Sequence, residues 1–297
     1  MAADDFIINL KKNFRHGNIV TRLLYINIGA FIATALVGIV LTLFKIPSLR
    51  WMRTLELPAW WENFVRQPWS LITYMFMHAD LLHILFNMLW LYWFGKLFLD
   101  FFSSKHLRGL YLLGGLCGGL LYMAAYHIFP YFEQALPTSY LLGASASVLA
   151  IVVAVAVKEP DYQVQLLLLG TVRLRTIASF IIAFDLLFIT SGNAGGHISH
   201  LGGALAGWWF AAGLRKGNDV TKWINAVLDC CVGWRKPTMR KPKMKVYYGD
   251  KQKDYEFNAR KKEREEEVDR ILDKLRKSGY GSLSEEEKKR LFEASKK

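Results

Sequence analysis

The sequence predicts an all-α, polytopic membrane protein, in which a bundle of six transmembrane helices is followed by a small cytoplasmic helical tail. Three observations predict this class. Hydrophobic residues make up 53% of the 297-residue chain. They gather in separate stretches, several of them close to the roughly 20 residues that a helix needs to cross a hydrocarbon core. Lys and Arg concentrate between and after these stretches, as they do on the cytoplasmic side of membrane proteins.

Six apolar stretches are the expected spans, of which the last two are short and must borrow residues from their flanks. The basic residues of segment 1–22 keep the N-terminus in the cytoplasm by the positive-inside rule, and six crossings return the C-terminus to the same side. The expected spans are Leu23–Phe44, Leu81–Phe102, Leu107–Phe129, Leu141–Val157, Thr176–Ile189 and Leu201–Leu214.

The chain after the last span changes character twice. Trp223–Trp234 has the pattern of a short interfacial helix, with Trp223, Ile224, Val227 and Leu228 toward the bilayer. The residues from Lys236 to Ala259 have little periodicity, so we expect an extended or disordered linker. Ser284 and Glu287 then form a capping-box pattern within a predicted helical hairpin. The predicted division is a cytoplasmic N-terminal segment (1–22), a transmembrane domain (23–216), an interfacial helix with linker (217–259) and a cytoplasmic helical hairpin (260–297).

The formal net charge is +13, and much of it lies after Arg235. A basic tail that follows a membrane domain is typical of the cytoplasmic face, where anionic lipid headgroups are its neighbours. We therefore expect the lipid bilayer as a partner and no nucleic acid, while the sequence identifies no partner for the tail. Residues 1–15 lack the apolar core of a cleavable signal peptide, which favours a bacterial inner membrane over an organelle membrane.

Two of the apolar stretches are rich in small residues and carry a polar residue at or near their start. Ser145 lies near the start of Leu141–Val157, and His200 immediately precedes Leu201–Leu214. Small residues let membrane helices approach closely, so these two faces can bring a hydroxyl and an imidazole together. Leu141–Val157 reaches only about 25 Å, against a hydrocarbon core of about 30 Å. The loop before it must then dip below the headgroups, which predicts a water-filled pocket.

Further polar residues lie near the outer ends of the expected spans. His83 and Asn87 are four positions apart and share one face of a helix, from which both can donate hydrogen bonds to an oxyanion; a polar knot that ties spans together is the alternative. Asp185 is a costly charge within a span, for which we favour a hydrogen-bonding or gating role over that of a triad acid. His78 and His197 have no assigned role. Because no acidic or thiolate ligand joins the histidines at a suitable spacing, we expect no metal and no cofactor.

Three separated motifs follow one another in register over roughly residues 20 to 215. They are the run from His78 to Trp90 that contains His83 and Asn87, the string Gly143-Ala144-Ser145, and the string His200-Leu201-Gly202-Gly203 followed by Gly207. Together they resemble the rhomboid family of intramembrane serine proteases. The resemblance implies a Ser-His dyad without a third acid, in which Ser145 is the nucleophile, His200 the general base, and His83 and Asn87 the oxyanion-hole donors.

The implied function is a serine endopeptidase that cleaves transmembrane segments of other membrane proteins near their outer ends. One departure from the family pattern concerns the base. Leu149 stands where many members have a tyrosine that stacks on the histidine, so other packing must hold His200. A non-catalytic relative that binds or escorts transmembrane helices is the alternative, although such relatives usually lose the serine or the histidine. A transporter would need paired half-sequences, and the chain has no convincing internal repeat.

Overall fold

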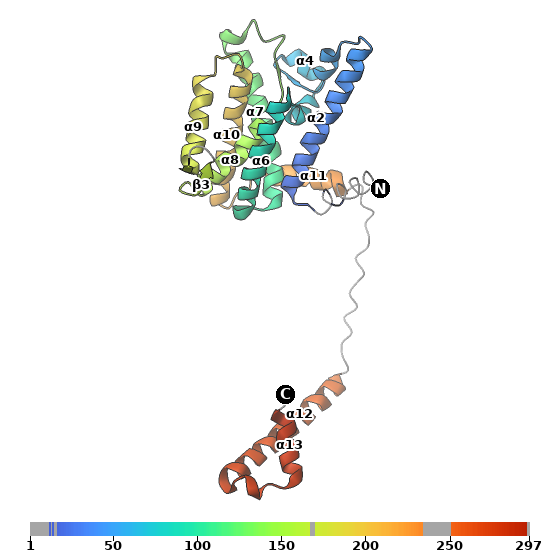
Figure 1. Ribbon diagram of the computed structural model, residues 1–297, viewed down its shortest axis with the longest axis vertical. Coiled ribbons are helices and arrows are strands. Elements are labelled where there is room, and N and C mark those ends of the chain that lie inside the picture. The colour runs from blue at the N-terminus through green and yellow to red at the C-terminus, as the bar shows by residue number, and fades with distance from the viewer. Residues whose placement is uncertain (1–11, 13, 15–16, 167–169, 234–250, 296–297) are drawn as a thin grey trace. The chain divides into compact units, whose positions relative to one another are not determined.

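A computed structural model describes residues 12, 14, 17–166, 170–233 and 251–295 of the chain. The chain divides into two compact units, Met1–Arg235 and Lys236–Lys297. Within the described residues, six long helices build the first unit (Figure 1). They are α2 (Ile19–Leu43), α6 (Leu81–Phe101), α7 (Ser104–Ile128), α8 (Ser145–Lys158), α9 (Leu174–Leu187) and α10 (Ala194–Arg215).

Helix α8 occupies the middle of the bundle. It packs against α6, α7, α9 and α10, and α10 also packs along α7. Every residue of α8 from Ala146 to Ala156 is buried. This burial follows from its composition, because Ala, Val, Leu and Ile dominate that range and give the helix no polar face beyond its ends. The first residue of α8, Ser145, is therefore held in place by a closely packed helix.

Each predicted span overlaps one of the six helices, but their bounds and lengths differ. The predicted start of the fourth span at Leu141 is wrong, because Leu141 pairs in a short β-ladder and α8 begins only at Ser145. By length and composition, α2, α6 and α7 are long and apolar enough to cross a membrane, whereas α8 is shorter. Helix α9 also has 14 residues, or about 21 Å. Helix α10 begins at Ala194, well before the predicted start at Leu201. His197 and His200 therefore lie inside this helix and not in the connection that precedes it.

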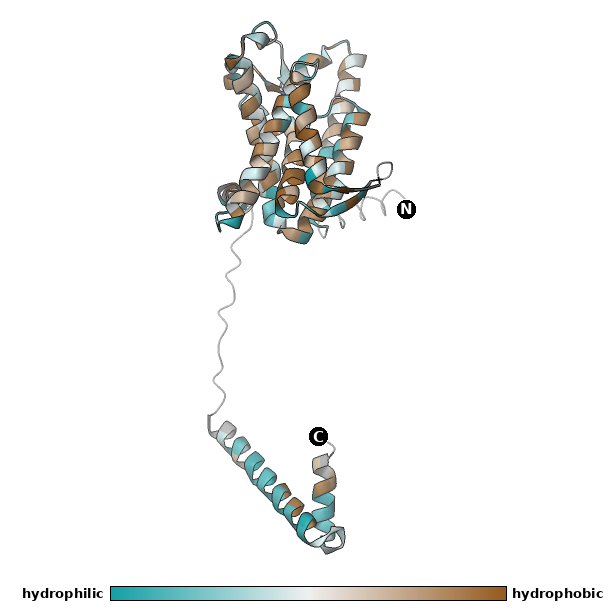
Figure 2. Ribbon diagram, turned by 90° about the vertical axis from the view of Figure 1, so that its left-hand side faces the viewer, coloured by the Kyte–Doolittle hydropathy of each residue, from teal (hydrophilic) through white to brown (hydrophobic). Residues whose placement is uncertain are grey.

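Large apolar side chains are exposed on the outward faces of the bundle helices. Figure 2 shows apolar residues along all of these helices, in contrast to the mostly polar second unit. An apolar surface of this extent marks contact with lipid or with another protein, and together with the three long apolar helices it identifies a membrane protein. Exposed examples are Ile32, Leu36 and Ile39 on α2, Leu82 and Trp93 on α6, Phe180 and Leu187 on α9, and Leu205 and Trp208 on α10.

Glycines bring the backbone of α10 against those of α7 and α8. A Cβ atom added to Gly202 would lie 2.6 Å from the carbonyl oxygen of Cys117 on α7. A Cβ atom added to Gly203 would collide with the carbonyl oxygen of Ala146 on α8. Side chains at either position would separate the helices, so the contact exists because glycine has none. The close packing predicted for the small residues after His200 is confirmed.

Two short β-ladders lie in the connections, which the all-α prediction did not include. β1 (Leu57–Pro58) pairs antiparallel with β2 (Tyr140–Leu141), and β3 (Gln163–Leu166) pairs antiparallel with β4 (Gly170–Arg173). Such ladders satisfy backbone groups that helices do not pair, and segments this short leave too little alternation to detect from sequence. Short helices complete the connections: α3 (Ser48–Met52), α4 (Trp61–Arg66), α5 (Ser70–Thr73), η1 (Tyr74–Phe76) and η2 (Pro130–Phe132).

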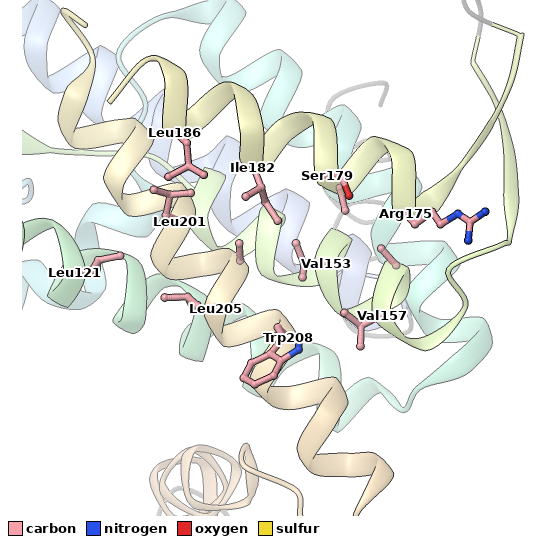
Figure 3. Close-up of a pocket in the computed structure, with 13 residues that line it drawn as sticks. Leu121, Val153, Val157, Arg175, Ser179, Ile182, Leu186, Leu201, Leu205 and Trp208 are labelled. Atoms are coloured by element: carbon pink, nitrogen blue, oxygen red, sulfur yellow. The ribbon is translucent and has the colours of Figure 1, made fainter. Parts of the chain in front are cut away.

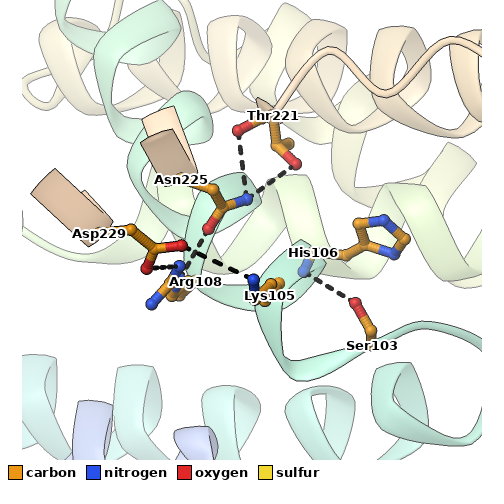
Figure 4. A network of polar contacts seen from close by, with 7 residues as sticks. All are labelled: Ser103, Lys105, His106, Arg108, Thr221, Asn225 and Asp229. Atoms are coloured by element: carbon orange, nitrogen blue, oxygen red, sulfur yellow. Dashed lines mark hydrogen bonds and ion pairs between the residues drawn. The ribbon is translucent and has the colours of Figure 1, made fainter. Parts of the chain in front are cut away.

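Helix α11 (Lys222–Gly233) is fastened to the first turns of α7 by a polar network (Figure 4). Arg108 donates to the side-chain oxygen of Asn225 at 2.6 Å and to the carboxylate of Asp229 at 2.5 Å. The ammonium group of Lys105 lies 3.6 Å from the same carboxylate. The hydrogen bond from Arg108 holds the pKa of the Asp229 carboxyl below its usual range. This network orients α11 across the start of α7.

The helix predicted after the last span is thus present as α11, with two residues placed differently from the prediction. Trp223 and Val227 are exposed, as expected for contact with lipid headgroups and acyl chains. Ile224 and Leu228 were predicted to face the bilayer as well, but Ile224 is 4% exposed and belongs to the core of the bundle, and Leu228 is partly buried against that core. The polar network explains the difference, because it rotates the Asn225 face of α11 toward α7 and takes Ile224 with it.

The second unit consists of α12 (Lys251–Ser278), η3 (Tyr280–Ser282) and α13 (Glu285–Ser295). The capping box is confirmed: the carboxylate of Glu287 accepts the N–H of Ser284 at 2.7 Å, and the hydroxyl of Ser284 accepts the N–H of Glu287 at 3.3 Å. The prediction of an extended linker is wrong for residues 251–259, which form the first turns of α12. The remainder of that linker, and most of segment 1–22, lie outside the described residues.

Candidate active site

Ser145 is the first residue of α8, and the chain reaches it through a turn that requires glycine. Gly143 has a φ of 127°, a backbone conformation that side chains disfavour. Its N–H donates to the carbonyl of Tyr74 at 2.9 Å, which holds the turn against η1. The N–H of Ser145 belongs to the first helical turn and has no acceptor within the helix. It therefore points out of α8 at the positive end of the helix dipole.

Ser145 and His200 are in direct contact. The hydroxyl oxygen of Ser145 lies 2.7 Å from Nε2 of His200, which α10 supplies from the other side of the small-residue contact. Both side chains are half-buried, so water can reach them. A hydroxyl hydrogen-bonded to an imidazole nitrogen is the arrangement of a nucleophile with its general base. The two residues that the sequence singles out are brought together.

Asp185 stands behind the imidazole, on α9. Its Oδ1 atom lies 2.9 Å from Nδ1 of His200 and 2.8 Å from Nδ1 of His197. The carboxyl group is 2% exposed. An ionised carboxylate only accepts hydrogen bonds, so both rings must carry their proton on Nδ1 in this arrangement. The hydrogen-bonding role favoured for Asp185 on sequence grounds agrees with these contacts.

His83 and Asn87 approach Ser145 from α6. A Cβ atom added to Gly143 would lie 3.0 Å from Nε2 of His83 and 3.6 Å from the Ser145 hydroxyl, so the ring borders the glycine turn. The N–H of Ala79 donates to Nδ1 of His83 at 3.3 Å, which puts the proton of a neutral ring on Nε2, facing the turn. The amide of Asn87 donates to the carbonyl of His83 at 2.9 Å and keeps a second N–H.

A cleft of about 230 Å³ opens beside Ser145 and His200. It lies over α8, between the residues that α6 and α9 contribute. Its walls are mainly apolar, and its few polar groups are those of the candidate site. A mainly apolar cleft with a few convergent polar groups is typical of a binding site. The remaining lining residues are Phe86, Asn87, Trp90, Val148, Leu149, Val152 and Ile181.

A larger cavity of about 560 Å³ lies between α8, α9 and α10 (Figure 3). Apolar side chains such as Val153, Ile182, Leu205 and Trp208 line it. Arg175 stands at one end, and its guanidinium group points away from the apolar side chains in Figure 3. None of the predicted site residues lines this cavity, so the reactive groups belong to the smaller cleft.

Two features of the site did not follow from sequence. Asp185, His197 and His200 place donor atoms within 4.8 Å of one another. Their residue types suit a metal ion, so the expectation that no acidic ligand joins the histidines is wrong. Hydrogen bonds pair the same atoms with one another. Asp185 precedes His197 by 12 positions and His200 by 15. A helix connection lies within this spacing, so the sequence does not show that the three side chains face one another. His78 is buried with its ring centroid 5.2 Å from that of His83, and neither of its ring nitrogens has a partner among the described residues.

Comparisons with known proteins place these residues within one domain. Residues 65–217 match the Rhomboid domain family, and residues 251–297 match a family of unknown function (DUF6576). Over 157 residues the chain is 32% identical to RHOMBOID-like protein 12, mitochondrial, from Arabidopsis thaliana, which covers 50% of this chain and 47% of the relative. The chain thus matches about half the length of that curated relative. His83, Asn87, Ser145 and His200 all fall within the matched domain.

Proposed function

The chain belongs to the rhomboid family, and from that membership we propose that it is an intramembrane serine endopeptidase. The observation that carries the proposal is the 2.7 Å contact between the Ser145 hydroxyl and Nε2 of His200 beside an apolar cleft. The proposed substrates are transmembrane segments of other proteins. Such segments suit the apolar walls of the cleft, and local helix-weakening residues would expose their backbone to attack.

In the proposed reaction, His200 acts as general base and Ser145 as nucleophile. Nε2 of His200 takes the hydroxyl proton while the oxygen attacks the scissile carbonyl carbon. Collapse of the tetrahedral intermediate breaks the peptide C–N bond, and the imidazolium returns its proton to the leaving amine. Water then gives a proton to His200 and attacks the acyl-enzyme, which releases the carboxylic acid and restores the Ser145 hydroxyl.

Three hydrogen-bond donors would stabilise the oxyanion of the tetrahedral intermediate. The backbone N–H of Ser145 lies at the start of α8, where the helix dipole favours negative charge. Nε2–H of His83 faces the Gly143 turn, and Asn87 retains an N–H beyond its bond to the His83 carbonyl. Donors held in place before the reaction stabilise the developing charge without reorganisation, and each one contributes about 3 kcal/mol in other acyl-transfer enzymes.

The proposed membrane arrangement has six spans, with both termini in the cytoplasm. The shortness of α8 supports a position of Ser145 below the outer headgroups, where the cleft between α6 and α9 would open laterally to lipid. We propose a bacterial inner membrane as the location, as the sequence favours. The Arabidopsis relative is a mitochondrial protein by name, which favours an organelle membrane instead. Fractionation of the source cell distinguishes the two.

Cleavage of a reconstituted substrate tests the proposed function. The full chain is placed in liposomes with a single-span protein that carries a fluorescent tag on each side of the membrane. Wild-type protein should cut the span, and Ser145→Ala and His200→Ala should not. Ser147→Ala is the matched control, because Ser147 lies on the same helix, is 1% exposed, and its hydroxyl has no hydrogen-bond partner among the described residues. It should cleave at the wild-type rate.

The alternative is a rhomboid-like protein that binds or escorts transmembrane helices without cutting them. Such a protein would retain the single-span partner in a pull-down from detergent, and Ser145→Ala would change neither the retention nor the size of the partner. Cleavage that persists in Ser145→Ala would contradict the proposed mechanism as well, because the reaction would then need a different nucleophile.

A further inference from the structure

A buried carboxylate completes a line of hydrogen bonds through the candidate base. The distance from the Ser145 hydroxyl oxygen to Nε2 of His200 is 2.7 Å. The distance from Nδ1 of the same ring to Oδ1 of Asp185 is 2.9 Å. The three residues come from three helices, α8, α10 and α9. No other acidic side chain in the described part of α9 or α10 is buried. The carboxylate thus stands on the side of the imidazole opposite the hydroxyl.

We propose that Asp185 is a positioning residue that extends the Ser145–His200 pair to a hydrogen-bonded triad, a role that the sequence alone did not favour, with His197 as a second donor to the same carboxylate oxygen. This inference rests on the proposed function. It departs from the dyad that the family resemblance implies, because the base is fixed by a charged group from a neighbouring helix. The proposal has three physical grounds, which concern the tautomer, the charge and the packing of His200.

The tautomer of His200 depends on what its Nδ1 faces. An imidazole that is to accept the Ser145 proton needs a lone pair on Nε2, so its own proton must sit on Nδ1. A carboxylate cannot donate a hydrogen bond, so Asp185 permits only that tautomer. A carboxamide at the same position can present an N–H to Nδ1 instead and would stabilise the opposite tautomer, whose Nε2 cannot accept the proton. Asp185 therefore selects the reactive form of His200.

The charge of Asp185 also favours the state that His200 must reach during the reaction. Attack by Ser145 leaves an imidazolium on His200, and a carboxylate 2.9 Å away stabilises that cation in a site of low polarity. A buried carboxylate is costly unless hydrogen bonds compensate it. The Nδ1–H of His197 at 2.8 Å supplies a second such bond, while Oδ2 has no partner among the described residues. This incomplete pairing argues against a purely structural role, which an asparagine would serve at a lower cost.

Apart from Ser145, α8 offers only aliphatic side chains to the cleft beside His200, namely Val148, Leu149 and Val152. Leu149 stands where many family members have an aromatic ring. Among the described residues, the ring with which His200 makes a contact is His197, with centroids 6.1 Å apart. The other titratable group at the site is His83, on α6, whose ring borders the Gly143 turn beside Ser145. Asp185 is therefore the group that can hold the imidazole in the orientation that Ser145 requires.

The experiment measures the reactivity of Ser145 and the tautomer of His200 in the same full-chain preparations. The rate of covalent labelling by a fluorophosphonate probe reports activation of the nucleophile without a transmembrane substrate. Nitrogen NMR of protein labelled with 15N-histidine reports which ring nitrogen of His200 carries the proton, with His200→Gln used to assign the signal. Thermal unfolding in detergent establishes that each variant is folded.

Asp185→Asn should label roughly 100 to 10,000 times more slowly than wild type, the range that general-base catalysis and the acid of a serine-protease triad supply elsewhere. Its His200 should shift from the Nδ1–H to the Nε2–H tautomer. His197→Gln leaves the Asp185–His200 bond in place and should label within about tenfold of wild type, with the His200 tautomer unchanged. Asp100→Asn, at an exposed position near the end of α6, is the matched control and should label at the wild-type rate.

A folded Asp185→Asn protein that labels at the wild-type rate, or whose His200 keeps the wild-type tautomer, would overturn the inference and leave the proposed function intact. A wild-type protein that does not label at all would instead overturn the proposed function. If Asp185→Asn does not fold, the wild-type spectrum decides. A proton on Nδ1 of His200 supports the positioning role of Asp185, and a proton on Nε2 overturns it.

Discussion

Replacement of Gly203 by alanine should push α10 away from α8 and slow the reaction of Ser145. The alanine Cβ would stand 2.8 Å from the carbonyl carbon of Ala146 and 3.0 Å from its Cα, and it would collide with the carbonyl oxygen. Ordinary contacts of a Cβ begin at 3.4 Å. The two backbones must therefore separate by at least about 0.6 Å, the difference between the 3.4 Å and 2.8 Å distances.

The size of the effect follows from that displacement. Overpacking of a close contact costs about 1 to 3 kcal/mol of stability. For a domain of this size each kcal/mol lowers the melting temperature by about 2 to 4 °C, so the expected loss is roughly 2 to 12 °C. Ala146 follows Ser145 directly, and Gly203 lies one turn after His200. A shift approaching 1 Å between reacting groups can lower the rate about 100-fold.

Two measurements on detergent-purified protein test this expectation. Tryptophan fluorescence follows the apparent melting temperature, and fluorophosphonate labelling follows the reactivity of Ser145. Gly29→Ala is the control, because a Cβ on Gly29 in α2 would meet nothing within 4 Å; it should leave both values unchanged. If Gly203→Ala melts and labels as wild type does, the two helices are not in the contact on which the site depends.

Three further predictions concern other parts of the chain. Gly143→Ala should lower Ser145 labelling at least tenfold, because φ at this position is 127° and the added strain is about 1 to 3 kcal/mol; Gly192→Ala, which has open space around it, should label normally. Ser284→Ala should destabilise α13 by about 1 kcal/mol through loss of its N-cap, seen as faster amide hydrogen exchange in that helix. The hydrogen bond from Lys274 lowers the pKa of Glu287 below its ordinary value of 4.5, so this contact stabilises the helix pair above that value and is lost as pH falls through the lowered pKa. Circular dichroism of Glu287→Gln should lack this acid-dependent step, and an unchanged step in that variant would contradict the assignment.

Much of the bundle could be predicted because long apolar stretches have few alternatives to helices in a membrane. The start of α10 was misplaced because Ala194, Gly195 and Gly196 are followed by His197, so the segment has the composition of a loop. Helical backbone is stable there because tertiary contacts, including the Asp185–His197 hydrogen bond, outweigh the low helix propensity of glycine. Local composition therefore predicts a helix in this region but places its first residue too late in the chain.

The candidate site was only partly accessible to sequence reasoning. Ser145 and His200 could be paired because each starts a small-residue face, and closeness of such faces follows from the size of glycine and alanine. The contact of Asp185 with both histidines could not be predicted, because it depends on how α9 and α10 are rotated after their connection. Successive residues of a helix are turned by about 100° around its axis, so a shift of α9 by one residue would direct Asp185 away from the histidines, and no local pattern fixes this angle.

The most direct test of the account is to find which residue a fluorophosphonate probe modifies in the membrane-embedded full chain, by mass spectrometry of its peptides. We expect an adduct on Ser145 in the wild type and in Ser147→Ala, and none in His200→Ala. A folded wild-type protein that is modified at another serine, or a His200→Ala variant that is modified at Ser145 as fast as the wild type, would contradict the claim that Ser145 is a nucleophile activated by His200.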